Sequence, residues 1–195
     1  MFDSRSAGLV RMLKLWFGVL LAGVPVAGSA VANDMHFTLQ EEDLRPRGFD
    51  LYQWIFADGD IVPGTSDQFK AFVASHLQLI GGATVILNSP GGSATEGMRL
   101  GETIRDLHFR TAVGVKSTEP LKSLPGQCMS ACIYPYLGGD YRYLDDGSVI
   151  GIHRFKFGQD LGGQLTAEVS QQLSGEIVDY IKKSSRLLKN ASILG

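Results

Sequence analysis

Residues 84–107 read TVILNSPGGSATEGMRLGETIRDL, and this stretch decides the fold class of the chain. It opens with a short apolar segment, Thr84 to Leu87, of the kind that forms a buried strand. A turn rich in Gly, Pro, Ser and Asn follows, from Asn88 to Ser93. The spacing of the next apolar residues predicts a helix over 94–107, with Met98, Leu100, Ile104 and Leu107 on one face. A strand that passes through a tight turn into a helix presents backbone amides to an oxyanion.

The segments before and after this stretch extend the same pattern. Residues 51–61 alternate loosely and predict a first strand, while 65–80 have helical spacing with Thr65 or Ser66 as the cap. Residues 111–115 predict the next strand. Strand, helix and strand joined by short turns imply parallel pairing. The sequence therefore predicts an α/β fold with helices packed on a sheet.

The apolar residues in the second half of the chain are spaced less regularly. Residues 116–127 lack periodicity and predict a surface loop, and 141–153 predict a hairpin with its turn at Asp145-Asp146-Gly147. Residues 129–137 have a helical composition. Pro135 conflicts with a helix that starts at Met129, because a proline beyond the first turn costs roughly 3 kcal/mol.

A long amphipathic helix is predicted after the glycine-rich residues 158–163. Thr166 is its expected cap and it runs to about Asn190. Its apolar stripe consists of Val169, Leu173, Ile177, Ile181 and Leu188.

The first 32 residues have the pattern of a secretory signal. Basic residues precede an apolar run from Leu15 to Gly28, which meets the small residues Ala30-Val31-Ala32. We expect cleavage after Ala32 and a periplasmic or secreted protein. An uncleaved membrane anchor and a later start at Met12 are the alternatives. The domain assignment is a signal peptide over 1–32, a polar linker over 33–50, and one domain over 51–195.

The charge balance argues against a nucleic-acid partner. The whole chain has 18 basic and 20 acidic residues. Removing residues 1–32 takes away three basic residues and one acidic residue, which leaves 15 against 19 and a net charge of about −4. A strongly basic face, which nucleic-acid phosphates require, is therefore not expected.

The two cysteines, Cys128 and Cys132, are four residues apart. Inside one regular helix their Cβ atoms would be about 6 Å apart, beyond the roughly 3.5–4.5 Å that a disulfide tolerates. A disulfide therefore requires Cys128 to lie outside the helix, and two small buried thiols are the alternative. No histidine is at metal-ligand spacing, so neither a metal site nor a cofactor is expected.

One serine and one histidine have the setting of a nucleophile and its general base. Ser130 lies among small residues at a predicted helix start, after Gly126-Gln127, and His153 ends a predicted strand. Each has a structural interpretation as well, because serine is favoured at helix starts and a histidine can be a buried core residue.

Taken in order, these motifs resemble the Clp protease and crotonase superfamily, and in particular its exported Clp-protease-like branch. The matching features are Ser89-Pro90-Gly91-Gly92 after a strand, Gly126-Gln127 before Ser130, and Ile152-His153, and the resemblance covers about residues 51–190. It implies a Clp/crotonase-like ββα superhelix with a parallel sheet core and a long C-terminal handle helix.

The resemblance also implies roles for single residues. Gly92 and Ala131 would donate the oxyanion hydrogen bonds, and Gly91 and Ser93 would contact the substrate. The handle helix implies stacking into homo-oligomers, and the substrate would be a peptide or an unfolded protein chain. A membrane partner is expected only through an uncleaved signal segment.

The chain departs from this family in its third catalytic residue. The family's acidic triad member lies beyond the handle helix, past Gly195. Either this chain is a fragment or its site works as a Ser-His dyad. Asp160 and Asp179 occupy positions without a family role. A related branch pairs serine with a downstream lysine, and Lys182 and Lys183 suggest that reading, although both are expected to be solvated helix residues.

Three classes of function follow. The first is an exported, ATP-independent serine peptidase that uses Ser130 and His153. The second is a catalytically silent assembly or binding protein with the same fold. The third is a crotonase-type enzyme that acts on an acyl thioester, against which export argues because such substrates are cytosolic.

Overall fold

The computed structural model describes the backbone of residues 33–48, 51–76, 79, 82–119, 122–152 and 163–191. By its internal contacts the chain divides into Met1–Val31 and Ala32–Gly195, and all described residues belong to the second unit. None of the helices in these residues is both long and apolar enough to span a bilayer.

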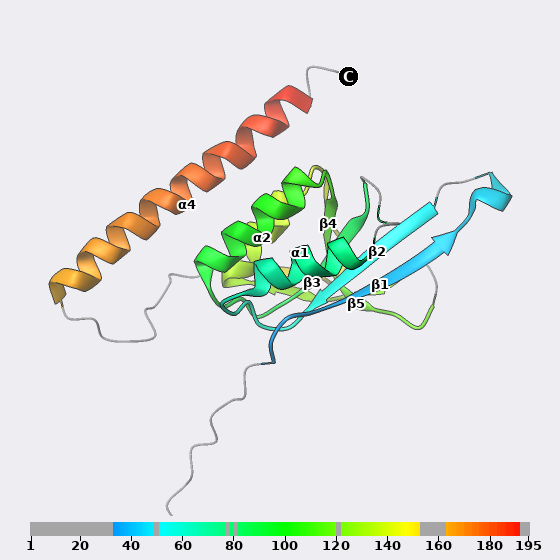
Figure 1. The fold of residues 1–195 in the computed structure, drawn as a ribbon, viewed down its shortest axis with the longest axis horizontal. Helices are drawn as coiled ribbons and strands as arrows, with labels where there is room; N and C mark the ends of the chain where they lie inside the picture. Colours follow the sequence, from blue (N-terminus) through cyan, green and yellow to red (C-terminus); the bar gives the residue numbers. More distant parts are fainter. Residues whose placement is uncertain are drawn as a thin grey trace, which may run out of the picture. The chain divides into compact units, whose positions relative to one another are not determined.

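A five-stranded sheet forms the centre of the fold (Figure 1). Its strands, in spatial order, are β1 (His36–Asp43), β2 (Leu51–Asp58), β3 (Thr84–Asn88), β4 (Arg110–Val113) and β8 (Arg142–Leu144). Only β1 is antiparallel to its neighbour, and every other pair is parallel. The predicted α/β fold with a mostly parallel sheet is therefore confirmed.

The edge strand β1 corrects the assignment of residues 33–50 as a linker. All eight residues of β1 pair with β2, from His36 opposite Asp58 to Asp43 opposite Leu51. Phe37 and Leu39 pack against the core on one face of β1, while His36 and Thr38, which alternate with them, are exposed. An edge strand with one solvated face has a polar composition similar to that of a linker, which explains the error. The 3-10 turn η1 (Arg45–Arg47) follows β1.

Two helices, α1 (Thr65–Ser75) and α2 (Ala94–Asp106), cover one face of the sheet (Figure 1). The main core lies between them and the strands and includes the fully buried Phe69, Val85, Leu87, Leu100 and Ile104. These are the positions that the apolar spacing predicts.

The caps of the two helices differ. The Ser93 hydroxyl accepts a hydrogen bond from the Glu96 backbone N–H, so Ser93 caps α2. Gly64, in the left-handed region, precedes α1. The expected cap by Thr65 or Ser66 is wrong, because Thr65 Oγ1 bonds back to the amide and carbonyl of Val62.

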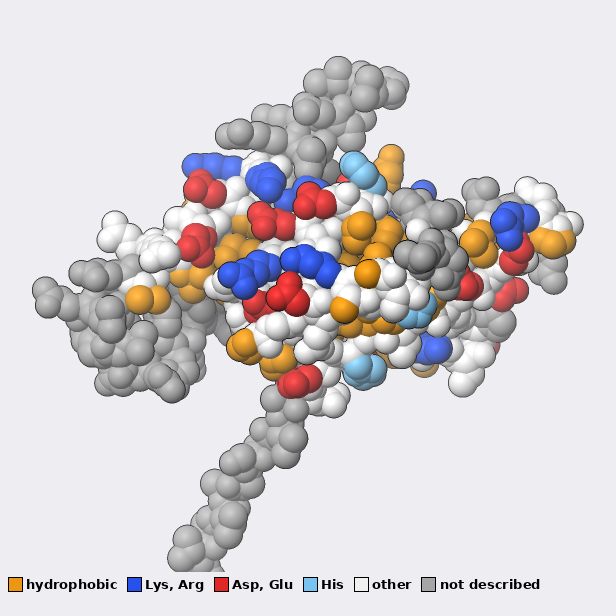
Figure 2. Space-filling model, viewed as in Figure 1, with side chains coloured by type: hydrophobic (Ala, Val, Ile, Leu, Met, Phe, Trp, Pro, Cys, Tyr) orange, Lys and Arg blue, Asp and Glu red, His pale blue; other side chains and the backbone are white. Residues whose placement is uncertain are grey.

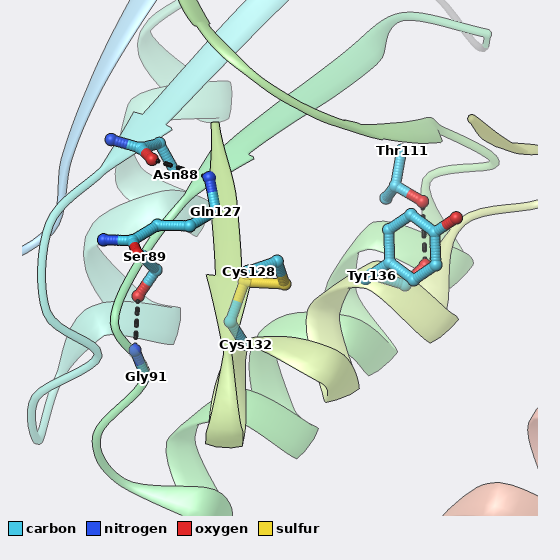
Figure 3. The surroundings of a disulfide bond; sticks show 8 residues. All are labelled: Asn88, Ser89, Gly91, Thr111, Gln127, Cys128, Cys132 and Tyr136. Carbon is cyan, nitrogen blue, oxygen red and sulfur yellow. Dashed lines mark hydrogen bonds between the residues drawn. A yellow bond between two sulfur atoms is a disulfide. The ribbon is translucent and has the colours of Figure 1, made fainter. Parts of the chain in front are cut away.

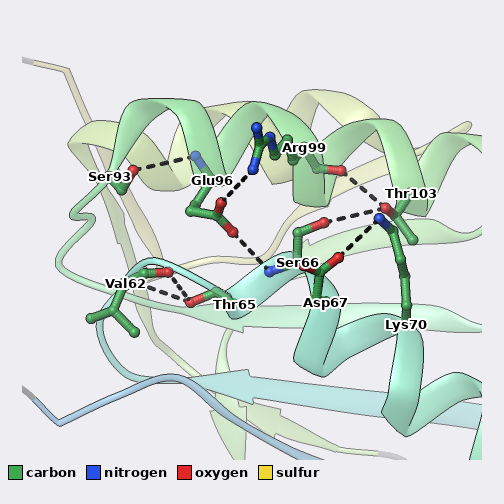
Figure 4. A network of polar contacts seen from close by, with 9 residues as sticks. All are labelled: Val62, Thr65, Ser66, Asp67, Lys70, Ser93, Glu96, Arg99 and Thr103. Atoms are coloured by element: carbon green, nitrogen blue, oxygen red, sulfur yellow. Dashed lines mark hydrogen bonds and ion pairs between the residues drawn. The ribbon is translucent and has the colours of Figure 1, made fainter.

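A buried carboxylate joins the first turns of α1 and α2 (Figure 4). Glu96 Oε2 accepts a 3.2 Å hydrogen bond from the Ser66 amide, and its Oε1 accepts one of 3.1 Å from Arg99. The Ser66 hydroxyl lies 3.4 Å from Thr103 Oγ1. A negative charge at a helix N-terminus is stabilising, so Glu96 fixes the start of α1 relative to α2.

The regions predicted as a loop and a hairpin contribute to four short strands besides β8. They are β5 (Val115–Lys116), β6 (Ser123–Leu124), β7 (Gln127–Met129) and β9 (Val149–Gly151). β5 pairs with β6, and β7 pairs in parallel with β9. The predicted hairpin is wrong because β8 joins β4 of the main sheet and β9 joins β7.

The conflict at Pro135 is resolved by the position at which the helix begins. Ser130–Cys132 form a 3-10 turn, η2, and the regular helix α3 covers Ile133–Gly138. Pro135 is thus the third residue of α3, within the first turn, where backbone N–H groups have no partner inside the helix.

The C-terminal helix α4 (Gly163–Ala191) begins three residues before the predicted cap, Thr166. The Tyr180 hydroxyl donates a 2.5 Å hydrogen bond to the carbonyl oxygen of Tyr134. Arg105 donates to Ser184 and its guanidinium lies 5.0 Å from the Tyr180 ring centre. Burial raises the pKa of Tyr180 to about 12, so its hydroxyl keeps the proton that it donates.

The buried stripe of α4 agrees with the predicted one at Leu173 and Ile177 but continues at Tyr180 instead of Ile181. Leu173 and Ile177 pack against the core and Tyr180 continues their row. Ile181, which the predicted stripe includes, is 43% exposed, and Leu188 has no described side chain.

Candidate active site

Ser130 occupies a sharp turn between a strand and a helical segment. It directly follows β7 and is the first residue of η2, with φ +54°. A left-handed conformation is uncommon for serine and is a form of backbone strain that concentrates at functional sites. In one large class of hydrolases, such a turn projects the nucleophilic serine. The Ser130 side chain is half-buried, so a substrate can reach it.

The Pro-Gly-Gly turn passes directly against Ser130. Gly91 has φ +103° and Gly92 has φ +134°, in the region that only glycine adopts readily. A Cβ atom added at Gly91 would lie 2.6 Å from the Met129 carbonyl oxygen, 2.8 Å from Ser130 Cβ and 3.1 Å from the Ala131 amide nitrogen. The structure therefore brings Gly91 into contact with the predicted nucleophile.

Gly92 approaches a different part of the chain. A Cβ atom there would lie 2.2 Å from the carbonyl oxygen of Ile61, which follows β2. Ile61 donates to the Gly91 carbonyl and accepts from the Ser93 amide, so this contact holds the turn from the other side. Ser93, predicted to contact the substrate, caps α2 with its hydroxyl.

Two polar side chains that the sequence analysis did not single out connect the glycine turn to β7 (Figure 3). Asn88 Oδ1 accepts a 3.0 Å hydrogen bond from the Gln127 amide, and its Nδ2 donates to Asp58. The fully buried Ser89 accepts from the Gly91 amide through Oγ, and its backbone bonds to Gln127 and Met129. Asn and Ser in a turn often bond to nearby backbone, which is the signal that could have identified them.

Within the described residues, the amides of Gly92 and Ala131 are among those that make no hydrogen bond. The Gly91 amide donates to Ser89 Oγ. Among the described residues, the Gly92 amide donates no hydrogen bond, and neither does the Ala131 amide, which lies at the start of η2 where helical partners are absent. Gly92 and Ala131 are the predicted oxyanion donors, and this role stays a prediction.

The histidine predicted as base, His153, lies outside the described residues. The strand that leads to it, β9, runs parallel to β7, with Gly151 opposite Met129. Ser130 is the residue after Met129, and Ile152, 75% exposed, is the residue after Gly151. The register thus brings the end of the strand before His153 beside the end of the strand before Ser130.

Cys128 and Cys132 form a disulfide, with a Cα–Cα distance of 5.2 Å (Figure 3). Cys128 lies in β7 and Cys132 ends η2, so Cys128 is outside the helix, as a disulfide requires. Both side chains are fully buried. The question that the sequence left open is decided in favour of the bond, and the ring that it closes contains Ser130.

Three charged residues of α4, Asp179, Lys182 and Lys183, face solvent. The Asp179 side chain is 84% exposed and lies 4.0 Å from Lys182 Nζ. Lys183 Nζ lies 3.4 Å from Glu102 on α2. These contacts agree with the expectation that Lys182 and Lys183 are solvated, and they give Asp179 no catalytic setting. Asp160 lies outside the described residues.

Besides the turn at Ser130, the described residues form a cavity but no metal-ligand cluster. A cavity of about 710 Å³ is lined by Arg105, Asp106, His108, Asp140, Asp179, Lys182 and Lys183, none of which is a predicted site residue. Within the described ranges, no group of three or more His, Cys, Asp and Glu could hold a metal ion. On the face shown in Figure 2, basic side chains lie among acidic ones rather than forming a basic patch.

Comparison with known proteins yields matches only among solved structures. No protein-family model matches the sequence, and no curated protein matches it. A structure described as an enzyme has 12% identity and a TM-score of 0.50, covering 74% of this chain and 81% of that one.

Two proteases are among the other structures that match. A ClpP1 variant from Listeria monocytogenes has 17% identity and a TM-score of 0.49, over 70% of this chain and 77% of that one. A membrane-bound stomatin-specific protease variant, in complex with a substrate peptide, has 20% identity and a TM-score of 0.46, over 68% of this chain and 57% of that one. Identities this low bear on the fold alone.

Proposed function

We propose that this protein is a serine hydrolase that cleaves peptide bonds, with Ser130 as nucleophile and His153 as general base. The observation that carries the proposal is the left-handed Ser130 on a strand-to-helix turn, packed against Gly91. The resemblance of the Ser89-Pro90-Gly91-Gly92 and Ile152-His153 motifs to Clp proteases supports a peptide, or an already unfolded chain, as the substrate.

The proposed reaction follows from the roles assigned to these groups. Ser130 Oγ attacks the carbonyl carbon of the peptide bond while His153 takes its proton. The carbonyl oxygen becomes an oxyanion, which the Gly92 and Ala131 amides stabilise by hydrogen bonds. His153 then gives the proton to the leaving amine as the C–N bond breaks. Water then attacks the acyl carbon while His153 takes its proton, and His153 returns that proton to Ser130 Oγ as the ester bond breaks.

Covalent labelling tests this function. A fluorophosphonate should form one adduct, on the peptide that contains Ser130, because an activated serine hydroxyl attacks phosphorus as it attacks a carbonyl. Ser130→Ala should abolish the adduct, which mass spectrometry of the digested protein would locate.

Ser75→Ala is the matched control, since Ser75 is exposed on α1 and its hydroxyl bonds to the Phe72 carbonyl and the neighbouring His76 ring, far along the chain from Ser130. It should label as the wild type does. A folded wild-type protein that forms no adduct would contradict the proposal and favour the catalytically silent protein.

The proposal extends to export and self-association. The Cys128–Cys132 bond is of a kind that persists in oxidising compartments. On α4, Val178 is 47% exposed, as an apolar residue under a partner copy would be in the isolated chain.

Protein purified from an exporting cell tests both parts of this extension. It should begin at Asn33 by N-terminal sequencing and have a mass above that of a monomer by light scattering. Recovery of intact Met1 in a membrane fraction would show an anchor instead. A monomer at micromolar concentration would contradict self-association.

A further inference from the structure

The Cys128–Cys132 disulfide closes a ring of five residues with Ser130 at its centre. Cys128 belongs to the strand that enters the turn, and Cys132 to the helical segment that leaves it. Figure 3 shows the bond between β7 and the start of the helical segment. The bond therefore links the two sides of the turn that carries the nucleophile.

Hydrogen bonds hold β7, the strand that leads into the turn, more firmly than they hold the turn itself. β7 is fixed through Met129 and Gln127 to Ser89, and by pairing with β9. Ser130 has φ +54°, and strained residues persist only where surrounding structure over-determines them. Among the described residues, the disulfide is the covalent constraint that spans Ser130.

A disulfide can stabilise the fold or fix local geometry, and the size of this ring favours the second role. A disulfide that stabilises a fold by restricting the unfolded chain gains more from a long loop than from a short one. A separation of four residues closes almost the smallest loop that a disulfide can close. Its geometric effect, in contrast, falls directly on Ser130 and on the Ala131 amide beside it.

We propose that Cys128 and Cys132 are positioning residues, whose disulfide holds Ser130 Oγ and the Ala131 amide in their reactive orientation. This inference rests on the proposed hydrolase function. Both cysteine side chains are fully buried, so soluble thiols do not reach the bond in the folded protein. Activity therefore depends on whether the bond formed during folding, and not on the later redox state of the solution.

The double variant Cys128→Ala, Cys132→Ala tests this role by the rate of fluorophosphonate labelling. The maximal labelling rate should fall at least 30-fold while the reagent concentration for half-maximal rate stays within about threefold, because the nucleophile and not the binding surface is displaced. Leu100→Ala is the control, since Leu100 is buried in α2 and does not belong to the turn. It should lower the melting temperature and keep the labelling rate of the folded protein.

Equal loss of labelling in Leu100→Ala and the cysteine variant, at a temperature where both are folded, would overturn the inference. Labelling of the cysteine variant within twofold of the wild type would overturn it too. If the variant does not fold, wild-type protein folded with and without reductant replaces it. Protein folded with reductant should label slowly, and oxidised protein given reductant afterwards should label at full rate.

Hydrogen exchange separates failure of this inference from failure of the proposed function. Peptides covering 126–138 should exchange faster in protein folded with reductant than in the oxidised protein, while those covering α2 stay protected. If the wild type never labels, the hydrolase proposal fails, and faster exchange confined to 126–138 would still show that the bond holds the turn. Unchanged exchange there would overturn the positioning role, whatever the labelling result.

Discussion

Ser130→Ala and His153→Ala should each reduce peptide hydrolysis roughly 10⁴-fold or more, and the double variant should be little worse than either. The reason is that nucleophile and base act as one unit. Without Ser130, His153 has no hydroxyl to deprotonate, and without His153, the Ser130 hydroxyl is not activated. Initial rates on an unfolded protein or a fluorogenic peptide, with the three variants at equal concentration, measure the effect.

Asp179→Asn is the control for this comparison. Asp179 lies on α4 with its side chain 84% exposed, so its substitution should leave turnover within about twofold. Full activity of Ser130→Ala would exclude Ser130 as the nucleophile. Additive losses in the double variant would show that Ser130 and His153 act separately.

Gly91→Ala should lower kcat/KM by about 10²-fold or more, the size of effect seen when an oxyanion donor is lost. The new Cβ would lie 2.6 Å from the Met129 carbonyl oxygen and 2.8 Å from Ser130 Cβ, so either the turn or the nucleophile must move. The left-handed φ of +103° adds strain of about 1 kcal/mol or more in any residue other than glycine. Kinetics and a thermal melt on the same preparation separate the two effects.

Gly175→Ala provides the matched glycine control. Gly175 lies within α4, and an added Cβ meets no atom within 4 Å. Alanine should stabilise this helix by about 0.5–1 kcal/mol and leave kcat/KM unchanged. Wild-type kcat/KM in Gly91→Ala would show that the contact between the glycine turn and Ser130 has no part in the reaction.

Residues 84–107 show what local sequence determines in this protein. The apolar run becomes β3, the Ser-Pro-Gly-Gly residues form the turn, and Ser93 caps α2, a position at which serine is favoured. These features depend on the period of apolar residues and on turn chemistry, both of which involve neighbours only a few residues away. Gly91, Gly92 and Ser93 of the candidate site belong to this stretch, whereas Ser130, Ala131 and His153 come from later motifs.

Tertiary pairing decided the features that local sequence describes wrongly. The polar segment 36–43 is a strand only because β2 pairs with all of it. Strands of three residues, such as β7 and β9, are too short to show a period, and their partners lie more than twenty residues away along the chain.

The reactive geometry also belongs to the tertiary structure. The left-handed Ser130 and the disulfide around it arise because β7 is fixed to Ser89 on one side and η2 packs below the glycine turn on the other. The sequence shows that Cys128 and Cys132 are close enough along the chain to bond. Whether they bond depends on the residue at which β7 ends and η2 begins, and long-range packing sets that boundary.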